Sequence, residues 1–169
     1  MMVCAEIIDK QRLYYQMYRV REIRKLQEEI DNISQMLGSP SGVKLTDMPR
    51  SQNPFDKIGN LISRKMEKEK KLEELVRVAQ HEKLILENII NKISILPENP
   101  KGPMNSVLQD ILRYRYIDDY PWKEIINLLC PDNDAFIDMT ESNLRKLHKW
   151  NGQALLKFIK CQGYLSTIT

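Results

Sequence analysis

Basic side chains gather near the end of this chain, between residues 140 and 160. Five of them oppose a single acid there, Glu141, which leaves a local charge of +4. Arginine and lysine side chains bind phosphate groups and the acceptor edge of guanine. The chemistry that this stretch favours is therefore recognition of a polyanion. The five basic residues are Arg145, Lys146, Lys149, Lys157 and Lys160.

Apolar residues recur among the basic ones at intervals of three and four, an interval that places side chains on one face of an α-helix. The apolar face carries Leu144, Leu147, Trp150 or Asn151, Ala154 and Phe158. The opposite face carries Arg145, Lys146, His148, Lys149 and Gln153. We therefore predict an amphipathic helix near residues 142–159 with a basic free face.

A basic helix that follows a pair of apolar helices is typical of a helix-turn-helix, which reads double-stranded DNA through the major groove. Arg145, Lys146 and Lys149 are expected to reach base edges. The plainer alternative is that this face is only the solvated side of an amphipathic helix. The DNA-binding residues predicted from the sequence are Ser142, Asn143, Arg145, Lys146, His148 and Lys149 on the helix, with Lys123 and Lys157 at phosphates.

No arrangement of side chains predicts an enzyme. His148 lies among lysines, and no serine or cysteine nearby has an orienting acid. The acidic run at residues 132–134 lacks the glycine and the later glutamate of a calcium loop. The three cysteines are far apart and have no C-x-x-C spacing, which indicates thiols in a reducing cytoplasm. We expect no catalytic residue, no cofactor and no bound metal.

Three consecutive helices are expected between residues 106 and 159. The first is expected to end at residues 118–119, and Pro121 falls near the first position of the second, where a missing N–H costs nothing. Side chains able to cap the third helix are Thr140, Ser142 and Asn143. The residues expected to form the core between the second and third helices are Trp122, Ile125, Leu128, Leu144 and Leu147.

The same stretch carries a pattern known from one protein family. An aromatic–isoleucine pair, a polar turn, a Trp-x-x-Ile helix and a basic helix closing on Gly-x-Ala-Leu follow one another. The matching residues are Tyr116, Ile117, Trp122, Ile125, Lys149, Gly152, Ala154 and Leu155. On these residues the stretch resembles the C-terminal module of RinA/ArpU-type phage regulators, which is itself similar to region 4 of bacterial sigma factors. A second match, Asp47-Met48-Pro49-Arg50, extends the resemblance over most of the chain.

The resemblance implies a transcriptional regulator of phage or prophage late genes, located in the cytoplasm of a bacterial host cell. The similarity to sigma factors further implies contact with RNA polymerase. Asn151 stands where the family usually has histidine. The family's short turn before the last helix is replaced here by residues 130–139, which carry Asp132, Asp134 and Asp138. This longer connection affects the angle between the two helices.

Two long helices are expected before this module, at about residues 5–37 and 55–95. A seam of period 3.5 in each favours a coiled-coil-like pair. The first seam contains Ile23, Leu26, Ile30, Ile33 and Leu37. The second contains Leu72, Leu75, Ala79, Leu86, Ile89 and Ile93, is broken at Glu82, and is weakened by Lys65 and Lys68. Because a narrow hairpin cannot bury both sides of its seam, we expect a homo-oligomer, a dimer or larger.

Proline and glycine cluster at two places and divide the chain. The sequence predicts an all-α fold, in which a long antiparallel helical hairpin precedes a C-terminal helix-turn-helix domain. The predicted parts are an oligomerisation hairpin at 1–96 with a loop at 38–54, a hinge at 97–103, and a DNA-binding domain at 104–169. No apolar run is long enough to span a bilayer, so no membrane association is expected.

Two other functions remain open. A small terminase-like subunit would also combine a helix-turn-helix with helical oligomerisation, and it would bind a packaging site. A protein-binding adaptor, with a helix-turn-helix that has lost DNA contact, would bind RNA polymerase or another protein. The acids Asp132, Asp134 and Asp138 favour the adaptor, because they would repel phosphates. A ring larger than a dimer would favour the terminase.

Overall fold

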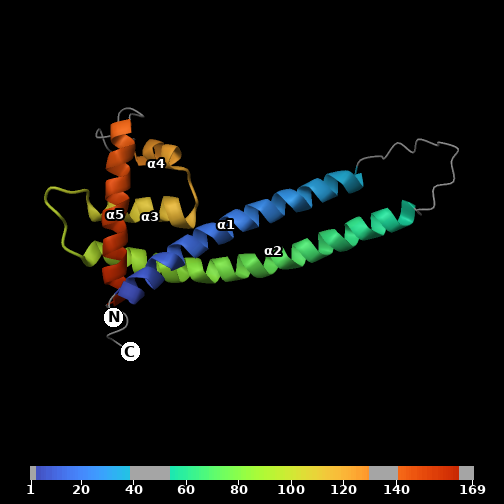
Figure 1. The fold of residues 1–169 in the computed structure, drawn as a ribbon, viewed down its shortest axis with the longest axis horizontal. Coiled ribbons are helices and arrows are strands. Elements are labelled where there is room, and N and C mark those ends of the chain that lie inside the picture. Colours follow the sequence, from blue (N-terminus) through green and yellow to red (C-terminus); the bar gives the residue numbers. More distant parts are fainter. Residues whose placement is uncertain (1–2, 39–53, 130–140, 164–169) are drawn as a thin grey trace. The chain divides into compact units, whose positions relative to one another are not determined.

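The computed structural model describes residues 3–38, 54–129 and 141–163, and every regular element in these ranges is helical (Figure 1). The predicted all-α class is therefore confirmed for the part of the chain described. The elements in order are α1 (Val3–Gly38), α2 (Pro54–Asn91), the 3₁₀ helix η1 (Lys92–Ile95), α3 (Asn105–Leu112), the π-helix η2 (Arg113–Ile117), α4 (Trp122–Leu129) and α5 (Glu141–Gly163).

The chain forms two compact units. The first unit contains Met1–Val20 and Ala79–Thr169, and the second contains Arg21–Val78. Helices α1 and α2 each contribute to both units. The boundaries thus fall inside the two long helices, whereas the sequence predicts a boundary at residues 97–103, which lie within the first unit.

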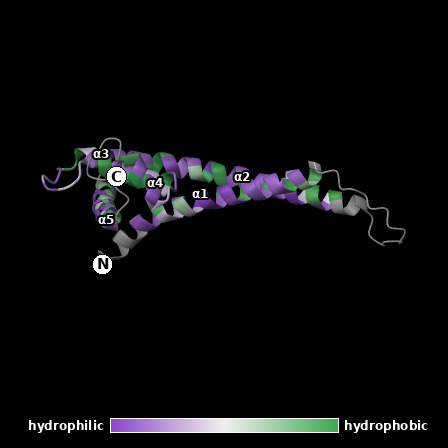
Figure 2. Cartoon of the chain, turned by 90° about the horizontal axis from the view of Figure 1, so that it is seen from above, coloured by the Kyte–Doolittle hydropathy of each residue, from purple (hydrophilic) through white to green (hydrophobic). Residues whose placement is uncertain are grey.

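In the second unit, segments of α1 and α2 run antiparallel and are joined by ion pairs. Lys71 Nζ lies 2.8 Å from Glu22 Oε1, and Lys68 pairs with Glu29. Leu26, from the predicted seam, is buried. Lys68 occupies a seam position, and its pairing with Glu29 explains how a charged side chain is tolerated there. Figure 2 shows hydrophilic residues covering much of the middle of α2.

The first unit has a core built from four segments of the chain. Apolar side chains of α1, of α2 with η1, of α3 with η2, and of α5 meet there. Because residues on both sides of 97–103 contribute, the end of the long helices and the C-terminal helices share one core. Its buried members are Leu13, Met17, Leu86, Ile89, Ile90, Ile93, Leu108, Leu112, Tyr116, Ile117, Ala154, Leu155, Phe158 and Cys161.

Polar side chains also connect α1 and α2 within the first unit. Glu82, which breaks the predicted seam, accepts a 2.8 Å hydrogen bond from Arg12 Nε. The side-chain amide of Gln16 donates to the Ala79 carbonyl at 3.1 Å. These two contacts set one register between α1 and α2 in this unit, because any shift along the helices would break both.

Residues 97–103 interrupt the helices, as their prolines and glycine predict. The segment is nevertheless bonded to the helices around it. Asn105 Nδ2 donates to the Leu96 carbonyl at 2.7 Å, and Lys157 of α5 donates to the Pro97 carbonyl at 3.0 Å. The break therefore lies against the shared core rather than standing free of it.

A second core joins α3, α4 and α5. Its buried residues are Val107, Ile111, Ile125, Ile126, Leu129 and Leu147, with Tyr114, Trp122, Leu144 and Trp150 packed at its edge. The predicted core residues Ile125 and Leu147 are fully buried, but the prediction for Leu128 is wrong, because its side chain is 42% exposed. The inward positions of α4 follow from Trp122 by three, four and seven residues, and Leu128 falls outside that phase.

The ends of α3 and α5 refine two further predictions. The first helix of the module continues from α3 into η2 and ends at Ile117, with Asp118 as its C-cap, close to the predicted position. Asp119 then has φ of 56°, a left-handed conformation that aspartate tolerates better than most residues. Helix α5 begins at Glu141, so Ser142 and Asn143 lie inside it and do not cap it. Thr140, residues 130–139 and Asp47-Met48-Pro49-Arg50 lie outside the described residues.

Candidate nucleic-acid interface

Helix α5 has one buried face and one basic face, as its spacing predicts. Leu147, Ala154 and Phe158 are completely buried against the two cores. Arg145 and Lys149 are exposed on the opposite side of the helix. The buried contacts hold the orientation of α5, so the basic side chains of its first half are presented together on one surface.

Arg145 is paired with an acid, but only weakly. Its Nη2 lies 2.5 Å from Glu141 Oε1, one helical turn away, and the two side chains are 78% and 79% exposed. Exposed pairs at this spacing contribute about 0.3–0.5 kcal/mol. A bidentate contact with guanine contributes roughly 1–3 kcal/mol of discrimination. The pair with Glu141 is therefore too weak to withhold Arg145 from a nucleic-acid partner.

The other predicted residues of α5 differ in exposure. Ser142 and His148 are exposed on the same side as Arg145, whereas Asn143 is half-buried. The Lys146 ammonium lies 5.0 Å from the centroid of the Trp150 ring, a cation–π contact along the helix. The surface that α5 offers most openly is thus formed by Ser142, Arg145, His148 and Lys149, which we call the α5 basic face.

Lys123 and Lys157 have different environments. Lys123 is exposed on α4. The Lys157 ammonium donates to the Pro97 carbonyl at 3.0 Å and also to Asn105 Oδ1. Since Lys157 follows Arg145 by twelve residues, about 18 Å along a helix, it lies far from the α5 basic face. Its bonds stabilise the 97–105 segment.

Arg115 lies beside this face and was not predicted from the sequence. The Arg115 guanidinium carbon of η2 lies 4.8 Å from the centroid of the Trp122 ring, and that ring packs edge-on against His148 with 4.7 Å between centroids. No periodic pattern indicates Arg115, because a π-helix and a left-handed turn set its position. The only signal in the sequence is an arginine between two tyrosines in a helix that ends at paired aspartates.

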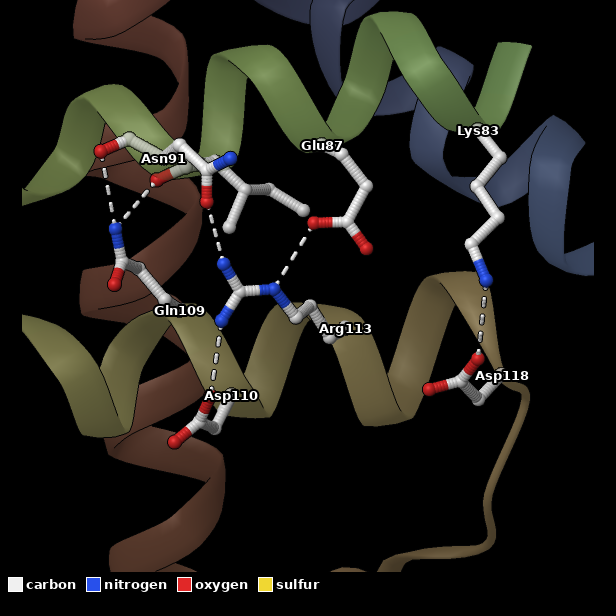
Figure 3. Close-up of polar contacts among 8 residues, drawn as sticks. Lys83, Glu87, Asn91, Gln109, Asp110, Arg113 and Asp118 are labelled. Atoms are coloured by element: carbon white, nitrogen blue, oxygen red, sulfur yellow. Dashed lines mark hydrogen bonds and ion pairs between the residues drawn. The ribbon is translucent and has the colours of Figure 1, made fainter. Parts of the chain in front are cut away.

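Arg113, two residues earlier and at the start of η2, contacts side chains of α2 and α3 (Figure 3). Its guanidinium donates to Glu87 at 3.0 Å, to Asp110 at 3.0 Å and to Asn91 at 2.6 Å. Burial alone would lower the pKa of Arg113, but its hydrogen bonds to the carboxylates of Glu87 and Asp110, with their charge, outweigh burial and raise the pKa. Arg113 therefore has a structural role and remains charged.

Three further contacts in Figure 3 hold α3 and η2 against α2. Gln109 Nε2 donates to the carbonyls of Ile90 and Asn91, at 2.9 and 3.2 Å, where α2 passes into η1. Lys83 Nζ lies 3.9 Å from Asp118 Oδ1 at the end of η2. The element that carries Arg115 is thus fixed at both ends.

A buried polar pair joins η2 to α5. Asn151 Nδ2 donates to the Tyr116 hydroxyl at 3.2 Å, and Tyr14 of α1 packs edge-on against Tyr116 with 5.3 Å between ring centroids. Burial raises the pKa of Tyr116, so its hydroxyl stays neutral. Asn151 Oδ1 is buried and has no hydrogen-bond partner among the described residues. Asn151 is therefore part of the buried contact between η2 and α5.

Two features of the described ranges bear on metal binding and on membrane crossing. These ranges contain no group of three or more histidine, cysteine, aspartate or glutamate side chains placed to hold a metal ion. Nor do they contain a helix that is both long and apolar enough to cross a bilayer. The feature with the clearest chemical capacity is the α5 basic face together with the arginine–aromatic contacts beside it.

Comparisons of the chain with protein-family models, curated proteins and solved structures find no match.

Proposed function

We propose that this protein is a sequence-specific regulator that binds double-stranded DNA and reads the major groove with the first half of α5. In this proposal α4 and α5 are the helix-turn-helix pair, and the regulated genes are phage or prophage late genes. The observation that supports this proposal is the α5 basic face. It is exposed to solvent on a helix whose opposite side is buried in the second core.

The arrangement suits groove reading for a mechanical reason. A recognition helix must present side chains at a constant depth, and that requires a rigid contact with the helix behind it. Leu147 is fully buried in the second core with Ile125 and Ile126 of α4. It lies two residues from both Arg145 and Lys149, on the opposite side of α5 from them. The contact limits rotation of α5 about its own axis.

Within this function the predicted residues have different tasks. Arg145 and Lys149 are the proposed base-reading pair, because both are exposed on one side of α5. Ser142 and His148 lie on the same side and assist. Lys123 of α4 is exposed and is proposed to bind phosphate, which sets the register of the protein on DNA.

We further propose that α1 and α2 form a long antiparallel hairpin that associates with a second copy of the chain. Its support is a stripe on α2 in the second unit, where Ile58, Ile62 and Met66 are 51%, 45% and 64% exposed at a spacing of four residues. Apolar side chains repeated at this spacing form one face of a helix, and a partner would bury them.

The test of DNA reading is selection of bound sequences from a random duplex library at two salt concentrations. The wild-type protein is compared with an Arg145→Ala/Lys149→Ala variant and with a control, Lys70→Ala/Arg77→Ala. The control removes the same charge from exposed positions of α2 in the second unit. We expect wild type and control to enrich one site and the first variant to enrich none.

Other results would redirect the proposal. Failure of the wild-type protein to enrich any site, with only weak salt-sensitive binding, would refute sequence-specific recognition and favour a protein-binding adaptor. Sedimentation analysis tests association, with Ile62→Glu/Met66→Glu expected to yield monomer. A ring larger than a dimer, combined with a site other than a promoter, would favour the terminase-like function.

A further inference from the structure

We propose that Arg115 binds a phosphate of the DNA backbone beside the groove that α5 reads. This inference rests on the proposed function and adds to it a contact from a different element, η2. It assigns a ligand to an arginine that the helix-turn-helix pattern does not include. The ligand is the phosphodiester group, recognised by its charge and its oxygen acceptors.

The guanidinium of Arg115 is positioned before any ligand binds. Its Nη1 donates to the Tyr120 carbonyl at 3.0 Å, and its carbon lies 4.8 Å from the Trp122 ring centroid. An arginine has five N–H donors in a planar fork. One donor bonds Tyr120, and the stacked fork retains others for an anion, so little side-chain freedom is lost on binding.

The backbone of η2 explains this placement. The Asp118 amide donates to the Arg113 carbonyl at 3.0 Å, and the Tyr120 amide donates to the Tyr114 carbonyl at 2.8 Å. These wide turns, with Asp119 in the left-handed region, bring the Tyr120 carbonyl back over the helix end. A regular α-helical end would place that carbonyl elsewhere. Single-turn π-helices of this kind occur frequently at functional sites.

The charge of Arg115 is not neutralised, which distinguishes it from its neighbour. Arg113 contacts two carboxylates, of Glu87 and Asp110. Arg115 has no carboxylate partner among the described residues, and its one polar contact is the neutral Tyr120 carbonyl. If Arg115 served only to hold the turn, a neutral donor would suffice. A guanidinium binds phosphate through charge-assisted hydrogen bonds, and Arg115 has charge and donors available for them.

The location next to the α5 basic face supports the assignment. The Trp122 ring contacts both Arg115 and His148, with 4.7 Å between the Trp122 and His148 ring centroids. His148 in turn lies one helical turn from Arg145 on the exposed side of α5. The Trp122 ring thus lies between Arg115 and His148, so Arg115 borders the α5 basic face at its His148 edge.

The test measures affinity for a mixed-sequence duplex between about 50 and about 200 mM salt, where each phosphate contact adds about 0.9 to the steepness of the log–log slope. Arg115→Gln keeps an N–H donor for Tyr120 and removes the charge, and Arg115→Lys keeps the charge. Lys101→Gln removes an exposed cation at residues 97–103 and is the matched control. Thermal unfolding of each variant is recorded in parallel.

We expect Arg115→Gln to bind more weakly, with a slope shallower by about one, and to unfold at the wild-type temperature. Arg115→Lys and Lys101→Gln should keep the wild-type slope. An unchanged slope in Arg115→Gln would overturn the inference, and so would a lowered unfolding temperature without a change of slope, which marks a structural residue. If these results occur while Arg145→Ala/Lys149→Ala still loses site selection, the proposed function survives. If no variant or wild type binds duplex, both fail.

Discussion

Removal of the Ile126 side chain should destabilise the first unit far more than removal of Leu128, although both lie on the same short helix. Ile126 is 1% exposed in the second core, whereas Leu128 is 42% exposed. The sequence predicted Leu128, together with Ile125, in the core and did not predict Ile126, so this comparison tests which phase of α4 is correct.

The magnitude follows from burial. Replacing a fully buried isoleucine by alanine costs about 2–5 kcal/mol, since apolar contact is lost and a cavity remains. The second core has six buried side chains, and Ile126 contributes one of the larger ones. We therefore expect about 3 kcal/mol for Ile126→Ala. Leu128→Ala should change the free energy of unfolding by less than about 0.5 kcal/mol, as most surface substitutions do.

Tryptophan fluorescence during urea unfolding is a suitable assay, because the two tryptophans of the chain, Trp122 and Trp150, both pack at the edge of the second core. With urea slopes of about 1–3 kcal/mol per M, a loss of 3 kcal/mol lowers the midpoint by roughly 1–3 M. Helical circular dichroism of the folded variants should remain unchanged, which serves as the control for α4 formation.

A larger loss for Leu128→Ala than for Ile126→Ala would refute this phase of α4, and with it the proposed support beneath the α5 basic face. Equal and small losses would show that the second core contributes little to stability. In that case α5 would need another source of rigidity to read a groove.

Three further outcomes are expected. A fragment of residues 104–169 should show little helix by circular dichroism, since the first core loses every side chain from α1 and α2; a cooperatively folded fragment would contradict this core. Tyr116→Phe should cost about 1–3 kcal/mol in urea unfolding, because Asn151 Nδ2 loses its buried acceptor, and a neutral effect would contradict the contact. The hydrogen bond from Lys68 lowers the pKa of the Glu29 carboxyl below its ordinary value of 4.5. The ion pair therefore stabilises the folded state fully above pH 4.5, and this stabilisation is lost as pH falls through the lowered pKa of Glu29. Lys68→Met should therefore unfold at higher pH in an acid titration, and an unchanged acid midpoint would contradict the pair.

Local pattern was sufficient for much of this protein. The spacing of Leu144, Leu147, Ala154 and Phe158 predicted which face of α5 is buried, and all four are half-buried or buried. The prolines and glycine of 97–103 predicted a break between helices, which the structure confirms. These features depend on helical geometry and on the backbone limits of proline, which act within a few residues and so can be read from the sequence.

Side-chain partners could not be predicted in the same way. Lys157 was expected at phosphate, yet it donates to the carbonyl of Pro97, sixty positions earlier in the chain. Glu82, which looked like a defect in the seam, is bonded to Arg12. A charged side chain can satisfy its hydrogen bonds with any acceptor or donor that packing brings near, and sequence spacing does not contain that information.

The sequence by itself therefore determined the helical class, most helix limits and the basic face of α5, because each arises from a period or a breaker within one segment. Only the tertiary structure decided that the ends of the long helices share a core with the C-terminal helices, that Leu128 faces solvent, and that Arg115 stacks on Trp122 beside His148. These depend on which distant faces pack together. The π-helix η2 is the clearest example. Its turn contains one residue more than an α-helical turn, which changes the direction of the side chains that follow.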